Sequence, residues 1–198
     1  PVENRVDILF LGDGYRAEDM DLYAQHLDDI LAGLFAETPF AEYASYFNVR
    51  KVEVLSEDGC IDENWPVDDC DTALDMRIAG GRGLAMDNNK CADAAACDSS
   101  WDTAVVLGNT TSSAGSAGIG GWALSSGGYF HADRIVLHEV GHSFGHLKDE
   151  YFYGSSHYDG NEWFAANLSI YDAAAQIERE TKWYRWLNDP DHPDVGTF

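Results

Sequence analysis

Val6-Asp-Ile-Leu-Phe-Leu-Gly-Asp-Gly14 is the stretch from which the fold can be worked out. Its apolar run is long enough for one buried strand, and Gly12-Asp-Gly14 is typical of a tight turn after that strand. Beyond the turn, residues 17–37 carry apolar side chains at helical spacing, and residues 47–55 alternate apolar and polar side chains. This order predicts a strand, a helix and a second strand, which is a β-α-β unit.

The rest of the chain adds further elements to this unit. Residues 103–107 predict a third strand, and residues 135–145 and 170–187 predict two helices. The Gly- and Ser-rich residues 109–121 are typical of a mobile loop, and the apolar island at 119–124 predicts an edge strand. We expect an α/β (α+β) fold with a mixed, twisted sheet in one domain, because 198 residues with 45% hydrophobic side chains suit a single core.

The charge balance excludes one class of partner. The formal net charge is -23, from 12 Lys and Arg against 35 Asp and Glu. This excess of negative charge repels phosphate backbones, so we expect no nucleic-acid partner. No apolar run approaches the ~18 residues of a membrane span, so we expect none. None of these features predicts an oligomeric state.

Four cysteines indicate the compartment. Their even number, in a polar stretch without the two-residue spacing of a zinc ribbon, favours two disulfides in a secreted protein, either extracellular or periplasmic. Sequence alone permits three pairings. We expect the local one, which joins Cys60 to Cys70 and Cys91 to Cys97.

His138-Glu139-Val-Gly-His142 is the strongest chemical signal in the chain. It matches the pattern H-E-x-x-H, of which a chain of this composition would contain roughly 0.015 copies by chance. Residues four apart share one helical face, so both imidazoles would hold a single Zn²⁺ while Glu139 faces a water on the same ion. We therefore predict an active-site helix with His138 and His142 as metal ligands.

A catalytic zinc needs a third protein ligand, and several residues after the motif are candidates. His146 would lie about 12 Å from His138 along an unbroken helix, which is too far for both to share the ion. Gly145 is expected to end the helix in a left-handed conformation and to return a downstream residue to the metal. The candidates, in order of preference, are Asp149, Glu150 and His157.

A metal-activated water would then hydrolyse peptide bonds. Zinc acidifies the water and polarises the scissile carbonyl, and Glu139 as general base takes the proton and delivers it to the leaving amine. Among the tyrosines after the motif, Tyr153 is our candidate donor to the oxyanion. The edge strand expected at residues 119–124 would bind an extended peptide through its backbone, which a proline at Ala123 would test.

The residues around the motif resemble a known family. The segment from His138 to Tyr151, HEVGHSFGHLKDEY, is similar to the active-site segment of the IgA-peptidase family of metzincin-like zinc metallopeptidases. Further segments resemble that family's landmarks, namely Phe10-Leu-Gly-Asp-Gly-Tyr15, Pro39-Phe40, Tyr46-Phe-Asn-Val49 and Lys182-Trp-Tyr-Arg-Trp186. The resemblance implies a metallopeptidase fold, a single catalytic zinc, Glu139 as base and protein or peptide substrates. It also implies Asp149 as the third ligand.

One landmark of that family is not found after the motif. Metzincin-like enzymes carry a methionine turn beneath the zinc, whereas Met20, Met76 and Met86 all precede the motif. We therefore expect residues 1–198 to form a single catalytic domain that is truncated before this turn.

Two other functions and one other ion stay open at this stage. A non-catalytic zinc-containing module that binds a peptide or glycoprotein would have the same motif, and so would a zinc hydrolase of non-peptide amides. Eight acidic residues between Glu57 and Asp75 form either a solvated loop or a set of oxygen ligands for Ca²⁺. The endopeptidase and the solvated loop are the preferred alternatives.

Overall fold

The computed structural model describes residues 4–98, 100–151 and 161–191, and the chain divides into two compact units, Pro1–Gly145 and His146–Phe198. The first unit contains strands, α-helices and short 3-10 helices (η). In chain order they are β1 (Val6–Asp13), η1 (Ala17–Asp19), α1 (Met20–Leu34), α2 (Phe40–Tyr43), η2 (Ala44–Tyr46), β2 (Phe47–Val52), β3 (Arg77–Ile78), β4 (Leu84–Ala85), α3 (Asn88–Ala95), β5 (Thr103–Gly108), β6 (Gly115–Ala117), β7 (Ala123–Ser126) and α4 (Ala132–Ser143). The predicted β-α-β unit and the third strand are confirmed.

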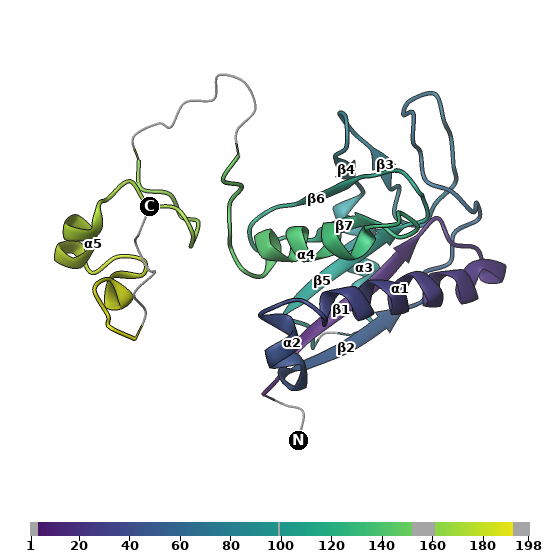
Figure 1. Cartoon of the computed structure of the whole chain (residues 1–198). Helices are drawn as coiled ribbons and strands as arrows, with labels where there is room; N and C mark the ends of the chain where they lie inside the picture. Colours follow the sequence, from purple (N-terminus) through teal and green to yellow (C-terminus); the bar gives the residue numbers. More distant parts are fainter. Residues whose placement is uncertain (1–3, 99, 152–160, 192–198) are drawn as a thin grey trace. The chain divides into compact units, whose positions relative to one another are not determined.

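A five-stranded sheet organises this unit, with the strand order β2-β1-β5-β7-β6 (Figure 1). The strands from β2 to β7 run parallel, and β6 at the edge is antiparallel to β7. A separate antiparallel hairpin consists of β3 and β4. The expected mixed α/β class is confirmed. None of the described helices is both long and apolar enough to cross a membrane.

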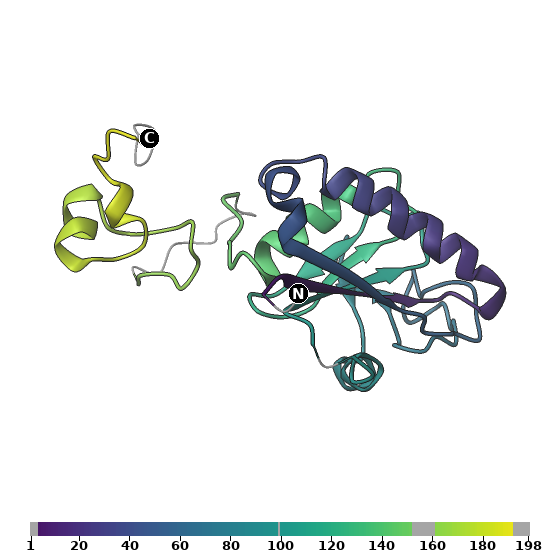
Figure 2. The same ribbon diagram turned by 90° about the horizontal axis from the view of Figure 1, so that it is seen from below.

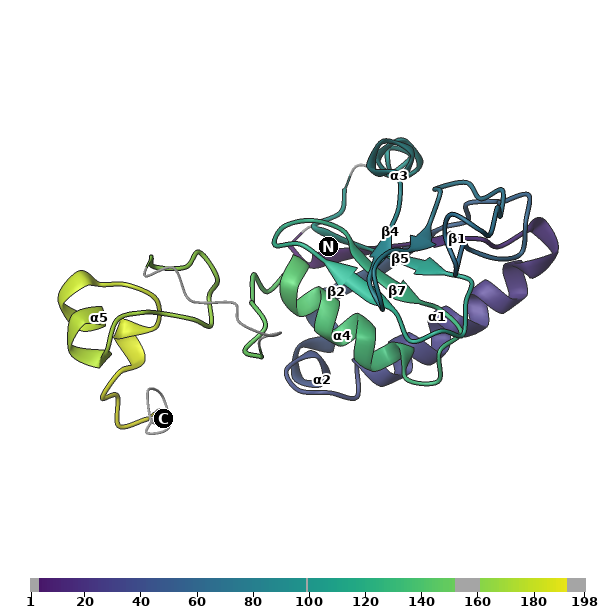
Figure 3. The same ribbon diagram turned by 90° about the horizontal axis from the view of Figure 1, so that it is seen from above.

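Two hydrophobic cores lie on opposite faces of the sheet. Ile8 and Phe10 of β1 pack in the core that contains α1 and α4. Leu9 and Leu11 pack in the other core, which contains α3 and the β3–β4 hairpin. Figures 2 and 3 show α1 and α4 together on one face and α3 on the other. Because side chains alternate along a strand, a central strand covered on both faces needs the uninterrupted apolar run that β1 has.

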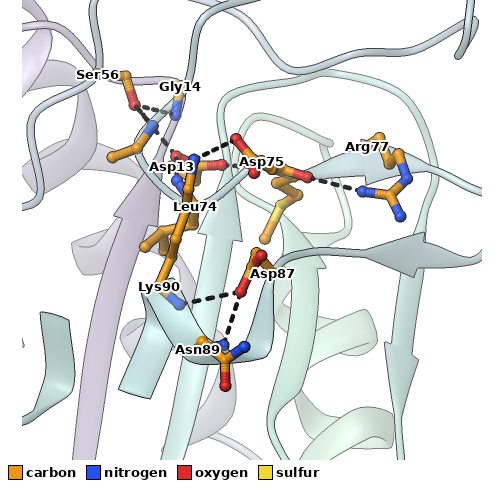
Figure 4. Close-up of polar contacts among 11 residues, drawn as sticks. Asp13, Gly14, Ser56, Leu74, Asp75, Arg77, Asp87, Asn89 and Lys90 are labelled. Atoms are coloured by element: carbon orange, nitrogen blue, oxygen red, sulfur yellow. Dashed lines mark hydrogen bonds and ion pairs between the residues drawn. The ribbon is translucent and has the colours of Figure 1, made fainter. Parts of the chain in front are cut away.

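The connection between β2 and β3 is anchored by Asp13, at the carboxyl end of β1 (Figure 4). The buried carboxylate of Asp13 accepts hydrogen bonds from the backbone N–H groups of Leu74 and Met76, each at 2.9 Å. It also accepts the hydroxyl of Ser56 at 3.1 Å, and Ser56 Oγ in turn accepts the N–H of Gly14 at 2.9 Å. These hydrogen bonds join both ends of the connection to the sheet.

The same connection contains one of the two expected disulfides. Cys60 and Cys70 are bonded, but the second expected pair is wrong, because Cys91 and Cys97 are free. The side chain of Cys91 faces the core from α3, and burial raises the pKa of its thiol to about 12. Cys97 follows the end of that helix and is exposed, with its Sγ donating to the Ala94 carbonyl at 3.2 Å. The two thiols therefore lie in different environments, one buried and one exposed.

Removing the disulfide is expected to destabilise the protein. Replacing Cys60 and Cys70 by serine should lower the free energy of unfolding by about 3 kcal/mol, because the bond closes a loop with a sequence separation of 10. Urea denaturation would measure this loss, with the exposed Cys97→Ser as a control of unchanged stability. A double variant as stable as the parent would show that the hydrogen bonds of Asp13 suffice to order the connection.

Two acidic residues of this connection, Asp58 and Asp62, bind its own backbone. Asp58 accepts the N–H of Asp71 at 2.8 Å, and Asp62 accepts the N–H of Cys70 at 2.7 Å. Within the described ranges, no group of three of these carboxylates forms a candidate metal site. The Ca²⁺ alternative is therefore not supported, and Asp58 and Asp62 instead hold parts of the loop together.

The edge of the sheet differs from the prediction. The strand predicted at 119–124 is wrong, because Gly118 and Gly121 are joined in a turn and Ala123 and Leu124 belong to β7, between β5 and β6. The edge strand is β6, inside the stretch predicted as a mobile loop. Its sequence, Gly-Ser-Ala, has no apolar pattern that would have indicated a strand.

The second unit contains α5 (Ala173–Arg179) and η3 (Tyr184–Trp186). Asp172 caps α5 by accepting the N–H of Ala175 at 2.8 Å. The helix ends where Glu180 adopts a left-handed conformation, with φ of 50°. The helix predicted over residues 170–187 is therefore correct in type but too long.

Candidate metal centre

The motif lies on α4, and the packing of this helix determines which side chains point outward. The helix predicted over residues 135–145 is confirmed, with both ends a few residues earlier. Val136 and Val140 are buried in the core that α4 shares with α1. His138 is exposed and His142 is partly exposed. The buried valines therefore anchor the helix while the two imidazoles remain accessible.

The two imidazoles converge on one point. Their Nε2 atoms are 3.1 Å apart, and their ring centroids are 4.6 Å apart. Two nitrogen ligands in tetrahedral coordination, each ~2.0–2.1 Å from zinc, would lie about 3.3 Å apart. The spacing of His138 and His142 therefore fits a shared zinc ion.

Glu139 completes a cluster with the two histidines. Its side chain is buried, with 7% of the residue exposed. One potential ligand atom from each of the three residues lies within 4.8 Å of the others. In the part of the chain that the structure describes, no other group of His, Cys, Asp or Glu side chains meets this criterion. The motif is thus the strongest candidate for a metal centre.

The left-handed residue that follows α4 lies one position later than predicted. The left-handed residue expected at Gly145 is instead His146, with φ of 53°. Phe144 and Gly145 both donate their N–H groups to the Val140 carbonyl, at 2.9 and 3.1 Å. The helix end is also joined to the β6–β7 turn, because the Ser143 carbonyl accepts the N–H of Gly120 at 3.0 Å. The helix therefore ends close to the predicted position, although the left-handed residue after it is His146 and not Gly145.

The candidates for the third ligand belong to the second unit. Asp149 is partly buried, and Glu150 is exposed and accepts the side-chain N–H of Asn167 at 3.0 Å. His157 lies outside the described residues, as do Tyr153 and Tyr158. Asp149 as a ligand and Tyr153 as an oxyanion donor therefore stay predictions.

Asn167 is a residue that the sequence analysis missed. Its side-chain oxygen accepts the N–H of Lys148, and its side-chain N–H donates to the Lys148 carbonyl, both at 2.8 Å. Together with the hydrogen bond to Glu150, these contacts hold both sequence neighbours of Asp149. The sequence signal at this position is an Asn-Leu-Ser glycosylation pattern, which does not indicate such a role.

A comparison with known protein families gives a match over most of the chain. The family model described as IgA Peptidase M64 matches residues 1–194, which include the whole motif and most of both units. No curated protein matches the chain. The resemblance noted in the sequence is thereby confirmed, and protein or peptide substrates follow from it. The chain belongs to the IgA peptidase M64 family of metallopeptidases.

Proposed function

We propose that the protein is a zinc-dependent endopeptidase with its reaction centre on α4. The observation that carries this proposal is the convergence of the His138 and His142 Nε2 atoms, 3.1 Å apart, beside the buried Glu139. In the proposal these two histidines and Asp149 hold the zinc, and the two units together form one catalytic domain. Nitrogen and carboxylate donors are the ligand types of catalytic zinc sites.

Each residue of the site has a separate task in the proposed reaction. Bound zinc supplies Lewis acidity, which makes water more acidic and a peptide carbonyl more electrophilic. Glu139 takes the proton of the attacking water and passes it to the leaving amine. Its side chain is buried beside Gly115 of β6, which limits its exchange with bulk water. Tyr153 is the proposed hydrogen-bond donor to the oxyanion.

The edge strand β6 is the proposed platform for the substrate backbone. Ser126 donates its N–H to the Ala114 carbonyl at 3.0 Å, so Ala114 and Ser126 are a hydrogen-bonded pair of the antiparallel ladder. Because such pairs alternate, the backbone groups of Gly115 and Ala117 point away from β7. The Gly115 N–H already donates a hydrogen bond to the Arg82 carbonyl at 3.0 Å, so it is not available to a substrate. We therefore expect an extended peptide to pair mainly with Ala117.

Proline at Ala117 is expected to weaken substrate binding. Proline removes an N–H that points outward and leaves the ladder to β7 intact, so KM should rise about tenfold for one lost hydrogen bond. Steady-state kinetics on a good peptide, with thermal unfolding beside it, would measure this. Ala123→Pro is the contrasting variant, because Ala123 is buried in interior strand β7 and its replacement should unfold the protein. An unchanged KM for Ala117→Pro would show that β6 does not bind the substrate backbone as proposed.

The disulfide bears on where the protein acts. A bond between Cys60 and Cys70 persists in oxidising compartments, so we propose that the protein is secreted, into the periplasm or the medium.

Reversible inactivation by a chelator tests the proposed activity. Purified protein should cleave casein or a peptide library, lose cleavage on treatment with 1,10-phenanthroline, and regain it on addition of Zn²⁺. Cleavage that survives complete removal of the metal would contradict the proposal. Zinc binding without cleavage would favour the binding module, and cleavage of small acylated amines alone would favour a hydrolase of non-peptide amides.

A further inference from the structure

Gly115 lies where the edge strand passes the proposed general base. On one side β6 pairs with β7, with Gly115 opposite Ser125. On the outer side the Gly115 N–H donates to the Arg82 carbonyl at 3.0 Å. The side-chain hydroxyl of the next residue, Ser116, accepts the Leu84 N–H at 2.8 Å. The strand is therefore held by β7 and by the β3–β4 hairpin.

A side chain at Gly115 would collide with α4. A Cβ built there would lie 2.4 Å from Ile135 Cγ2, 2.7 Å from Glu139 Oε1 and 3.3 Å from Glu139 Cγ. The first two distances are shorter than any normal contact, so atoms on α4 would have to move. At Gly118, the residue after the same strand, a Cβ would have nothing within 4 Å. Of these two glycines, Gly115 is the one without room for a side chain.

The two colliding groups differ in how they can respond. Ile135 is β-branched and has one strongly preferred rotamer in a helix, so it resists movement and the collision costs stability. Glu139 Oε1 is the end of a flexible side chain, so it yields by moving. Because β6 is held on both sides, the side chains on α4 must adjust, and of the two the Glu139 carboxylate moves more readily.

We propose that Gly115 is a positioning residue for Glu139. Its missing side chain leaves the space in which the carboxylate lies, so the edge strand determines where the proton acceptor sits relative to the substrate that the strand binds. This inference rests on the proposed function of Glu139. It also gives a role to one glycine in a stretch whose composition indicates a loop.

The first experiment measures kcat and KM for Gly115→Ala, with Gly118→Ala as the matched control. We expect kcat to fall about 10- to 100-fold, since small displacements of reacting groups have effects of this size. KM and the bound zinc should change little, because the collision does not involve Ala117 or the histidines.

A second comparison separates positioning from packing. Ile135→Leu lacks the colliding Cγ2, so it is made alone and together with Gly115→Ala to restore folding. If kcat recovers in Gly115→Ala/Ile135→Leu, the loss came from packing and the proposal is wrong.

A double-mutant cycle with Glu139→Asp tests the coupling itself. Aspartate is one methylene shorter, so its carboxylate lies back from a Cβ at position 115. Gly115→Ala should therefore reduce kcat less in the Glu139→Asp protein than in the parent, a departure from additivity expected of groups in contact. If the two changes act independently, so that their fold-reductions of kcat multiply, the proposal is overturned. An inactive parent would instead refute the proposed function, so the two failures are distinguishable.

Discussion

Replacing Glu139 by glutamine is expected to lower kcat roughly 10²- to 10⁴-fold, the contribution typical of a positioned general base. Glutamine is nearly the same size as glutamate, so it fills the buried space beside Gly115, but its amide does not accept a proton from water. The two imidazoles are unchanged, so the bound zinc should remain. Cleavage of a fluorogenic peptide, with elemental analysis of the same sample, would measure both properties.

The matched control is Glu178→Gln, a change of the same kind at an exposed position on α5. It should cleave the peptide as fast as the parent. If Glu139→Gln also retains parental kcat with zinc bound, another group takes the proton and the proposed role of Glu139 is wrong. If Glu139→Gln loses the zinc, the carboxylate acts on the metal rather than on the proton.

Replacing Asp13 by alanine is expected to lower the free energy of unfolding by roughly 3–5 kcal/mol. The change leaves the N–H groups of Leu74 and Met76 and the hydroxyl of Ser56 without their acceptor in a buried place. Each unsatisfied buried donor costs about 1–3 kcal/mol. The residues between Ser56 and Met76 should then separate from the carboxyl end of β1.

Asp87 offers a comparison, since its carboxylate also accepts two backbone N–H groups, those of Asn89 and Lys90, at 2.8 and 3.1 Å. It caps α3 at a partly exposed position, where water replaces the lost acceptor, so Asp87→Ala should cost only about 1 kcal/mol. Urea denaturation of both variants would measure the difference. Equal losses would mean that burial of Asp13 is not what makes its hydrogen bonds important.

Much of the first unit could be predicted because its signals are local. The apolar run of β1 and the helical spacing after it are properties of neighbouring residues, and both predictions are confirmed. The active-site helix could be found for the same reason, because H-E-x-x-H places both histidines on one face only if these neighbouring residues form a helix. These elements bring His138, Glu139 and His142 together.

The edge of the sheet could not be predicted, because contacts with distant residues determine it. The backbone of β6 is held by β7 and by the Arg82 carbonyl, and the Ser116 hydroxyl is held by the Leu84 N–H of the β3–β4 hairpin. Nothing in Gly-Ser-Ala indicates these partners. Asp13 shows the same limit. The sequence places it in a turn, whereas its importance depends on Leu74 and Met76, about sixty residues away.

The metal content of protein purified without chelators tests the central claim most directly. Elemental analysis of the parent should find about one zinc per chain, and His138→Ala and His142→Ala should each lose it while remaining folded. A parent with no zinc after exposure to Zn²⁺, or histidine variants that bind it as well as the parent, would contradict a zinc centre on α4.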